Sequence, residues 1–214
     1  MGMANQNWAQ AERRALCDLL AETGPDAPTL CEGWTTGDLA AHLLTRERRP
    51  DAAAGAMVPF LAGYSERVRL QTLERTPFPQ LVERVRQGPP TLSLFGVPGV
   101  DDLANTVEFF VHHEDARRGR PGWQPRQVPA ELEELLWRRL KMGRFTLRRL
   151  PVEITMAEPG GRTQRLTKGG PQVRVHGLPS ELTLWTTGRK DAARVELTGE
   201  ADAVNALTQA RWGV

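Results

Sequence analysis

The sequence of 214 residues has only two cysteines and no long uninterrupted apolar run. Cys17 and Cys31 form neither a CxxC pair nor a disulfide framework, which is typical of a reducing compartment. A membrane-spanning helix needs roughly 18 to 20 consecutive apolar residues, and the first residues, MGMANQNWAQAERR, lack the apolar segment of a signal peptide. We therefore expect a cytoplasmic protein with no membrane partner.

The chain also lacks a strong excess of either charge. Its 28 basic and 26 acidic residues give a formal net charge of +2, and no basic tail or stripe stands out. This balance argues against nucleic acid as a partner. Hydrophobic residues make up 40% and charged residues 25%, which is typical of a globular chain with a real core. The length suits one large domain or two small ones.

The first 150 residues have the pattern of helices. Apolar residues recur at helical spacing, and prolines and glycines separate the segments. Thr35 and Asp38 form a Thr-x-x-Asp variant of the capping box, which predicts a helix start. The apolar segment 89–100 is broken by proline and glycine, so we predict a packed loop there. The predicted helices cover residues 8–22, 36–49, 61–75, 79–87, 103–119 and about 129–150.

The pattern changes after Pro151. Short alternating segments joined by glycine turns predict strands in PVEITMA, RTQRLT, QVRVHG and ARVELTG. SELTLWTTG and ADAVNALTQAR have the spacing of helices. We therefore expect a mainly α protein with a helical domain over residues 1–150 and a small α+β domain over residues 151–214.

Three residues of the helical domain could bind one divalent metal ion. Glu108 and His112 stand four residues apart, so their side chains project from one face of a helix. His42 lies among apolar neighbours in DLAAHLL, where a histidine facing the core needs a partner. The alternatives are a solvated Glu108–His112 pair and a core histidine at position 42 bonded to a backbone carbonyl.

The runs CEGWTTGDLAAHLL, NTVEFFVHHEDARR, LWTTGRK and VELTGEADAV resemble the mycothiol-dependent maleylpyruvate isomerase family. The closest likeness is to an actinobacterial branch of metal-binding proteins without an assigned function. The resemblance implies a DinB-like four-helix metal-binding bundle joined to a small sterol-carrier-like C-terminal domain. It also implies His42, Glu108 and His112 as the metal ligands. An arginine of the C-terminal domain belongs to the family's active site, which makes Arg189 the catalytic candidate and Arg194 the alternative.

The resemblance further implies the chemistry. A divalent metal, with zinc as the default and iron, nickel or manganese also compatible with this ligand set, would bind mycothiol or a similar small thiol as its thiolate. The thiol would attack a small electrophilic substrate, in thiol transfer or in isomerisation. Two alternatives stay open: a non-catalytic metal-binding or regulatory interaction protein, and metal-assisted hydrolysis by bound water.

We expect structural roles for the other polar residues near these metal-ligand candidates. His113 is turned about 100° from its neighbour around the helix, so we expect it to line the pocket or to support a ligand. Asp38 could orient His42, but helix capping with Thr35 is the preferred role. We expect the charged run 114–118 to be a solvated helix end with an intrahelical ion pair.

Overall fold

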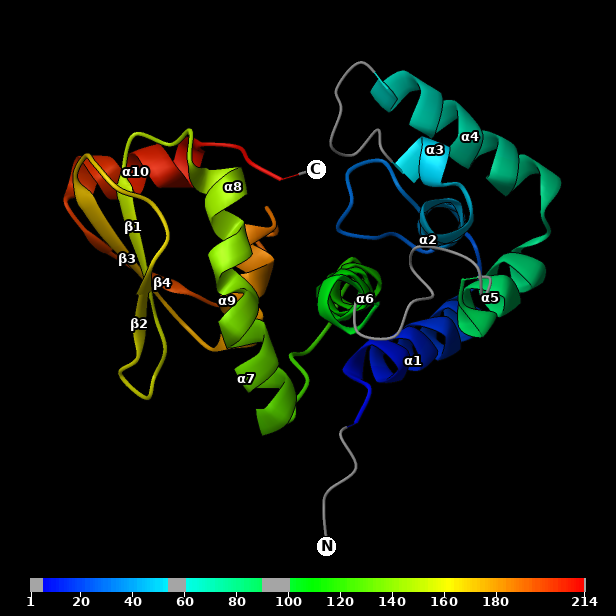
Figure 1. Cartoon of the computed structure of the whole chain (residues 1–214), viewed down its shortest axis with the longest axis horizontal. Helices are drawn as coiled ribbons and strands as arrows, with labels where there is room; N and C mark the ends of the chain where they lie inside the picture. The colour runs from blue at the N-terminus through cyan, green and yellow to red at the C-terminus, as the bar shows by residue number, and fades with distance from the viewer. Residues whose placement is uncertain (1–5, 54–60, 90–100, 214) are drawn as a thin grey trace, which may run out of the picture. The chain divides into compact units, whose positions relative to one another are not determined.

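The structure is a computed structural model that describes residues 6–53, 61–89 and 101–213. The chain divides into two compact units, Met1–Gln124 and Pro125–Val214. The first unit is helical, and the second combines helices with a small sheet (Figure 1). The expectation of a mainly α protein with a small α+β part is thus confirmed. Among the described helices, none is both long and apolar enough to cross a membrane.

The helices of the N-terminal unit follow the predicted segments closely. The capping box expected at Thr35 is present, because the Thr35 side chain accepts from the Asp38 backbone and Asp38 accepts from the Thr35 backbone. Gly24, at φ 77°, ends the first helix. The predicted loop 89–100 lies, apart from Pro89, outside the described residues. The elements are α1 (Trp8–Thr23), α2 (Thr36–Arg48), α3 (Pro50–Ala53), α4 (Ala62–Arg75), α5 (Phe78–Gln87) and α6 (Asp101–Arg118).

One apolar core holds these helices together. Helix α1 packs against α5 and α6, and α2 packs against α4 and α5. Leu39 and Leu43 of α2 and Phe109 of α6 are fully buried in the described core. Because these side chains fix both helices, the neighbouring positions on α2 and α6 are held at defined places. The core supports the arrangement of His42, Glu108 and His112 described below.

The C-terminal unit has a four-stranded sheet in the order β2-β1-β3-β4. Strands β1 and β3 pair in parallel, and β2 and β4 join them antiparallel. The buried side chains of β1 and β3 alternate with more exposed ones, as expected for a sheet with one covered face. The elements are α7 (Ala130–Arg139), η4 (Leu140–Gly143), α8 (Arg144–Leu147), β1 (Glu153–Ala157), β2 (Thr163–Arg165), β3 (Gln172–His176), α9 (Pro179–Thr186), β4 (Glu196–Gly199) and α10 (Ala201–Gln209).

The segment 129–150 differs from the single helix predicted for it. Helix α7 ends at Arg139, and the short 3-10 turn η4 separates it from α8. At Gly143 in this turn, a Cβ atom would lie 2.9 Å from the Thr186 side chain of α9. Trp137 and Leu147 share the core of the sheet unit. The two units therefore divide between residues 124 and 125, whereas the sequence pattern places the change at residue 151.

Candidate metal centre

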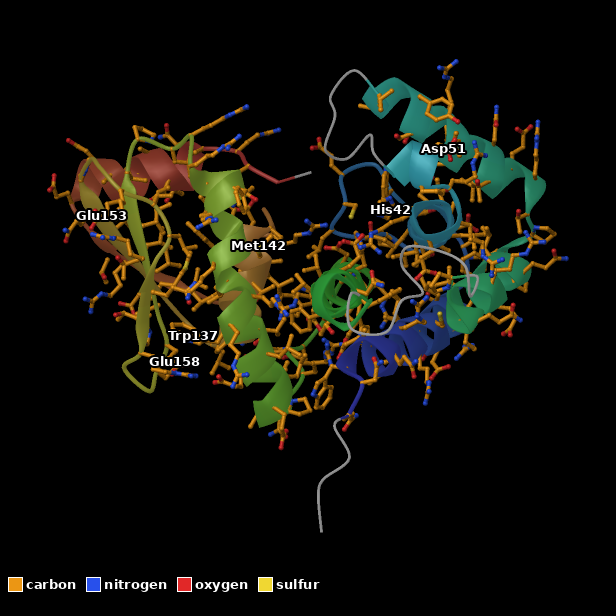
Figure 2. All side chains as sticks on the ribbon, in the orientation of Figure 1. His42, Asp51, Trp137, Met142, Glu153 and Glu158 are labelled. Atoms are coloured by element: carbon orange, nitrogen blue, oxygen red, sulfur yellow. The ribbon has the colours of Figure 1, made fainter. Side chains whose placement is uncertain are left out.

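Three side chains from two helices of the N-terminal unit come together: His42 of α2, and Glu108 and His112 of α6. Figure 2 labels His42 on its helix. The Nε2 atoms of His42 and of His112 each lie 3.4 Å from Oε1 of Glu108. The ring centroids of the two histidines are 5.1 Å apart. The structure thus brings together the three residues that the sequence singles out as ligand candidates.

The spacing of these donor atoms fits a divalent cation. Zinc binds imidazole nitrogen and carboxylate oxygen at about 2.0–2.2 Å, so two ligand atoms of a tetrahedral site lie roughly 3.3 Å apart. Both histidine–glutamate distances, at 3.4 Å, are close to that spacing. One donor atom from each of the three residues lies within 4.8 Å of the others. Two imidazoles and one carboxylate are also a donor set that zinc and related metals accept.

The pKa values of the three side chains of the centre are shifted in different directions. Burial lowers the pKa of His42 and so favours the neutral ring. Burial opposes ionisation of Glu108, but hydrogen bonds to His112 and His42 and the charge of Arg46 hold the pKa of this carboxyl well below its usual range. Burial also disfavours charge on His112, yet its hydrogen bonds with Asp115, Cys31 and Glu108 raise its pKa well above the ordinary value. Glu108 is therefore a carboxylate at neutral pH.

Arg46 holds the Glu108 carboxylate from one side. Its Nε atom lies 3.1 Å from Oε1 of Glu108, and its guanidinium donates to Oδ1 of Asn105 at 2.6 Å. Asn105 precedes Glu108 on α6 and is fully buried. Since both contacts come from one planar guanidinium, Arg46 restricts the position of the carboxylate between the two histidines.

Asp115 holds the other nitrogen of the His112 ring. The Nδ1 atom of His112 lies 2.8 Å from Oδ2 of Asp115, and the Cys31 thiol donates to the same oxygen at 3.3 Å. Asp115 has no exposed surface. A carboxylate on Nδ1 orients the ring so that Nε2 faces Glu108, and it would keep the proton on Nδ1 when Nε2 gives up its own proton to bind a metal. Cys31, His112 and Asp115 also form a second group whose donor atoms lie within 4.8 Å of one another.

The prediction of a solvated helix end at 114–118 is wrong for its acidic residues. Glu114 and Asp115 are both fully buried. The expected ion pairs do exist, because Arg118 donates to Glu114 at 2.6 Å and Arg117 lies 3.2 Å from it. The connection before α2 packs on this helix end, where the Leu30 amide donates to the Asp115 carbonyl. Asp115 comes three residues after His112 and so lies on the same face of the helix, and this spacing is the sequence signal that could have identified it.

His113 and Asp38 have partners other than the centre. The Nδ1 atom of His113 lies 2.8 Å from Oε2 of Glu12 on α1, so His113 joins two helices. Asp38 caps α2 and accepts from Arg69 at 2.5 Å, which confirms the capping assignment. Trp34 packs against the core of the N-terminal unit, and its ring centroid lies 5.1 Å from that of His42.

The chain matches the family model described as the mycothiol maleylpyruvate isomerase N-terminal domain over residues 8–142. This match covers more than half of the sequence. The chain belongs to this family. The family suggested by the sequence motifs is thereby confirmed, and the matched region contains all three residues of the candidate metal centre.

Two solved structures resemble this family member over nearly its whole length. One is described as the crystal structure of the mycothiol-dependent maleylpyruvate isomerase, with a TM-score of 0.56, 15% identity and coverage of 90% of each chain. The other is a histidine-to-alanine mutant described under the same name, with a TM-score of 0.56, 14% identity and the same coverage. At such identities the likeness shows a shared fold. Among curated proteins, none matches the sequence significantly.

The two arginines considered for catalysis lie in the C-terminal unit. Arg189 follows α9 and is 8% exposed, and its guanidinium donates to the Thr187 carbonyl at 2.6 Å. Arg194 has an exposed side chain, and its backbone amide donates to Glu181 at 2.8 Å. The three residues of the metal centre belong to the N-terminal unit.

Proposed function

We propose that this chain is a divalent-metal-dependent enzyme that uses a small thiol of the mycothiol type on a small electrophilic substrate. The reaction is S-transfer, or isomerisation by reversible addition of the thiol to a conjugated double bond. The observation that carries the proposal is the position of one carboxylate oxygen 3.4 Å from each of two histidine nitrogens. Family membership supports the thiol, because the related solved structure is described as mycothiol-dependent. We place the activity in the cytoplasm, where small thiols are kept reduced.

His42, Glu108 and His112 would hold the metal, with zinc as the default assignment. A divalent cation bound there would supply a Lewis acid that favours the thiolate form of a thiol at neutral pH. Three protein ligands leave a coordination position open, as in catalytic sites. Asp115 keeps the proton on Nδ1 of His112, and Arg46 orients the carboxylate of Glu108. These contacts prepare the ligand set before a thiol arrives.

We further propose that Arg189 binds a carboxylate of the substrate. A guanidinium can hold a carboxylate through two parallel hydrogen bonds, which an ammonium group cannot reproduce. We expect Arg189→Lys to raise KM for a carboxylate substrate about tenfold or more, while Arg194→Lys leaves it within twofold, in line with the usual value of a charge-assisted pair. The opposite ranking would transfer the role to Arg194, and no change in either variant would exclude both.

Metal content tests the ligand assignment. We expect the purified chain to retain close to one zinc ion after extensive dialysis, as measured by inductively coupled plasma spectrometry. His42→Ala, Glu108→Ala and His112→Ala should each retain only a small fraction. His176→Ala is the matched control, since His176 lies on β3 of the other unit. Full metal content in all three variants would refute the site.

Thiol dependence tests the reaction. The zinc-loaded chain is incubated with mycothiol and either maleylpyruvate or a chlorinated aromatic compound. We expect consumption of the electrophile, and thiol-dependent thermal stabilisation that His112→Ala lacks. Stabilisation without turnover would support a regulatory metal-binding protein. Turnover that needs zinc but no thiol would support hydrolysis. If neither turnover nor stabilisation occurs, the thiol-dependent function is wrong.

A further inference from the structure

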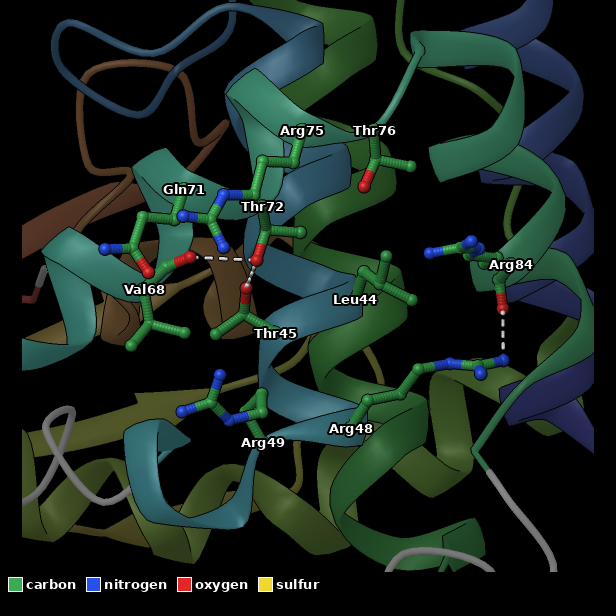
Figure 3. A pocket seen from close by; sticks show the side chains of 10 residues that line it. All are labelled: Leu44, Thr45, Arg48, Arg49, Val68, Gln71, Thr72, Arg75, Thr76 and Arg84. Carbon is green, nitrogen blue, oxygen red and sulfur yellow. Dashed lines mark hydrogen bonds between the residues drawn. The ribbon is translucent and has the colours of Figure 1, made fainter.

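A cavity of about 260 Å³ lies between α2, α4 and α5 in the N-terminal unit (Figure 3). None of its lining residues belongs to the candidate metal centre. Its lining combines arginine side chains, threonine and glutamine side chains and two aliphatic residues. The residues are Leu44, Thr45, Arg48, Arg49, Val68, Gln71, Thr72, Arg75, Thr76 and Arg84.

The lining contains four arginines and no carboxylate. Arg49 is neutralised outside the cavity, because its guanidinium pairs with Asp51 at 2.8 Å. Arg48 donates to the backbone carbonyls of Arg84 and Gly88, at 3.5 and 3.2 Å, and these contacts leave its charge uncompensated. In the part of the chain that the structure describes, no carboxylate lies within 4 Å of the guanidinium of Arg75 or Arg84.

Three cationic side chains thus line one cavity without an acidic partner, and all three are exposed. They come from three different helices: Arg48 from α2, Arg75 from α4 and Arg84 from α5. Like charges repel one another, and an anion bound in the cavity would offset that repulsion. The arrangement around a cavity, rather than along a stripe, favours a compact anion over a nucleic acid strand.

The remaining surface of the cavity suits the same kind of ligand. The buried hydroxyl of Thr45 donates to Thr72 at 3.2 Å, and Thr72 donates to the Val68 carbonyl at 2.8 Å, so both threonines are fixed in place. Gln71 adds an amide group at the edge, and Leu44 and Val68 supply apolar surface. A few fixed polar groups on an apolar base are typical of small-molecule sites.

We propose that this cavity binds a small molecule carrying a phosphate group, with the phosphate held by Arg48, Arg75 and Arg84. Guanidinium groups match the geometry of phosphate oxygens and bind them through paired hydrogen bonds. Phosphate carries close to two negative charges at neutral pH, more than a single carboxylate. The volume leaves room for a compact organic group beside the phosphate.

The test measures binding of inorganic phosphate and pyrophosphate to the zinc-loaded chain by titration calorimetry and thermal denaturation. Sodium chloride and succinate at matched ionic strength are the comparison salts. We expect saturable stabilisation by both phosphates, with pyrophosphate binding more tightly. Chloride and succinate should give a smaller shift that does not saturate. Equal shifts of the melting temperature in phosphate, pyrophosphate, chloride and succinate would show general charge screening and overturn the proposal. Tighter binding of succinate than of phosphate would overturn the assignment of a phosphate ligand.

Variants locate the binding. Arg75→Gln combined with Arg84→Gln should weaken phosphate binding at least tenfold while leaving zinc content unchanged. Arg67→Gln is the matched control, because Arg67 is an exposed arginine on the same helix as Arg75 but outside the cavity. Without phosphate, the double variant should melt at the same or a higher temperature than the wild type, since repulsion is relieved. Unchanged phosphate affinity in the double variant, or an equal loss in Arg67→Gln, would refute the site.

Discussion

Replacement of Asp115 by asparagine tests how the structure prepares His112 to bind a metal. Oδ2 of Asp115 lies 2.8 Å from Nδ1 of His112 and also accepts from Cys31 at 3.3 Å. Asparagine has nearly the same shape but is neutral, and charge-assisted hydrogen bonds are about twice as strong as neutral ones. Loss of such a partner of a metal-bound histidine typically costs about 10- to 100-fold in metal affinity. We expect Asp115→Asn to weaken zinc binding about tenfold, or roughly 1.4 kcal/mol.

The assay is competition for zinc between the protein and a chromophoric chelator at neutral pH. Asp115→Ala should show a larger loss than Asp115→Asn, because it removes the acceptor altogether. Cys31→Ser keeps a hydrogen-bond donor beside Asp115 and should stay within about threefold of the wild type. Asp38→Asn is the matched control, since Asp38 contacts Thr35 and Arg69. Zinc affinity of Asp115→Asn within twofold of the wild type would refute the role given to this carboxylate.

Two further predictions concern stability. Burial opposes ionisation of Asp38, but hydrogen bonds from Thr35 and Arg69 lower the pKa of this carboxyl in the folded protein. The ionised carboxylate therefore contributes fully to the free energy of unfolding above the ordinary carboxyl pKa of about 4. This contribution is lost as the pH falls through the lower pKa of the folded state. Asp38→Asn should therefore lower the free energy of unfolding by about 1 kcal/mol at pH 7, and urea denaturation should show this difference shrinking below about pH 4; a constant difference would contradict it. In Gly119→Ala, the new Cβ would meet the Thr29 backbone and lie 2.6 Å from the Pro28 carbonyl, which should cost about 1–3 kcal/mol. Gly63→Ala is the control, because nothing lies within 4 Å of its new Cβ, and it should raise the free energy of unfolding by up to about 1 kcal/mol. Equal effects of the two alanine variants in urea denaturation would contradict the close packing at Gly119.

The helix positions of the N-terminal unit could be predicted because their start and stop signals are local. Thr35 and Asp38 form hydrogen bonds within four residues, and Gly24 ends a helix through its own backbone conformation. The spacing of Glu108 and His112 is also a local property of one helix. The position of His42 beside them is not local, because 66 residues separate it from Glu108. The apolar neighbours of His42 make it a candidate, and the family resemblance supports its pairing with Glu108 and His112, whereas periodicity does not predict it.

The break in segment 129–150 had no comparable local signal. Its leucines continue at helical spacing through residue 147, so the pattern alone predicts one helix. Gly143, in the turn that follows the helix, lies close to Thr186, a residue far away in the sequence. Trp137 and Leu147 pack in the sheet unit, and an apolar stripe does not specify which core will cover it. The change of sequence pattern therefore predicts a boundary at residue 151, whereas the compact units of the structure divide after Gln124.

The burial of Asp115 explains why the charged run 114–118 is wrongly predicted to be solvated, although Asp115 is the residue that contacts His112. Five of the residues from His113 to Arg118 are polar or charged, which favours a solvated helix end. The structure covers that end with the connection before α2, whose Leu30 amide donates to the Asp115 carbonyl and whose Thr29 approaches Gly119. The same connection carries Cys31 to the Asp115 carboxylate. A buried carboxylate needs such partners to offset its lost hydration. It follows that Gly119→Ala, by displacing this connection, should weaken zinc binding as well as folding, whereas Gly63→Ala should change neither zinc affinity nor the environment of Asp115.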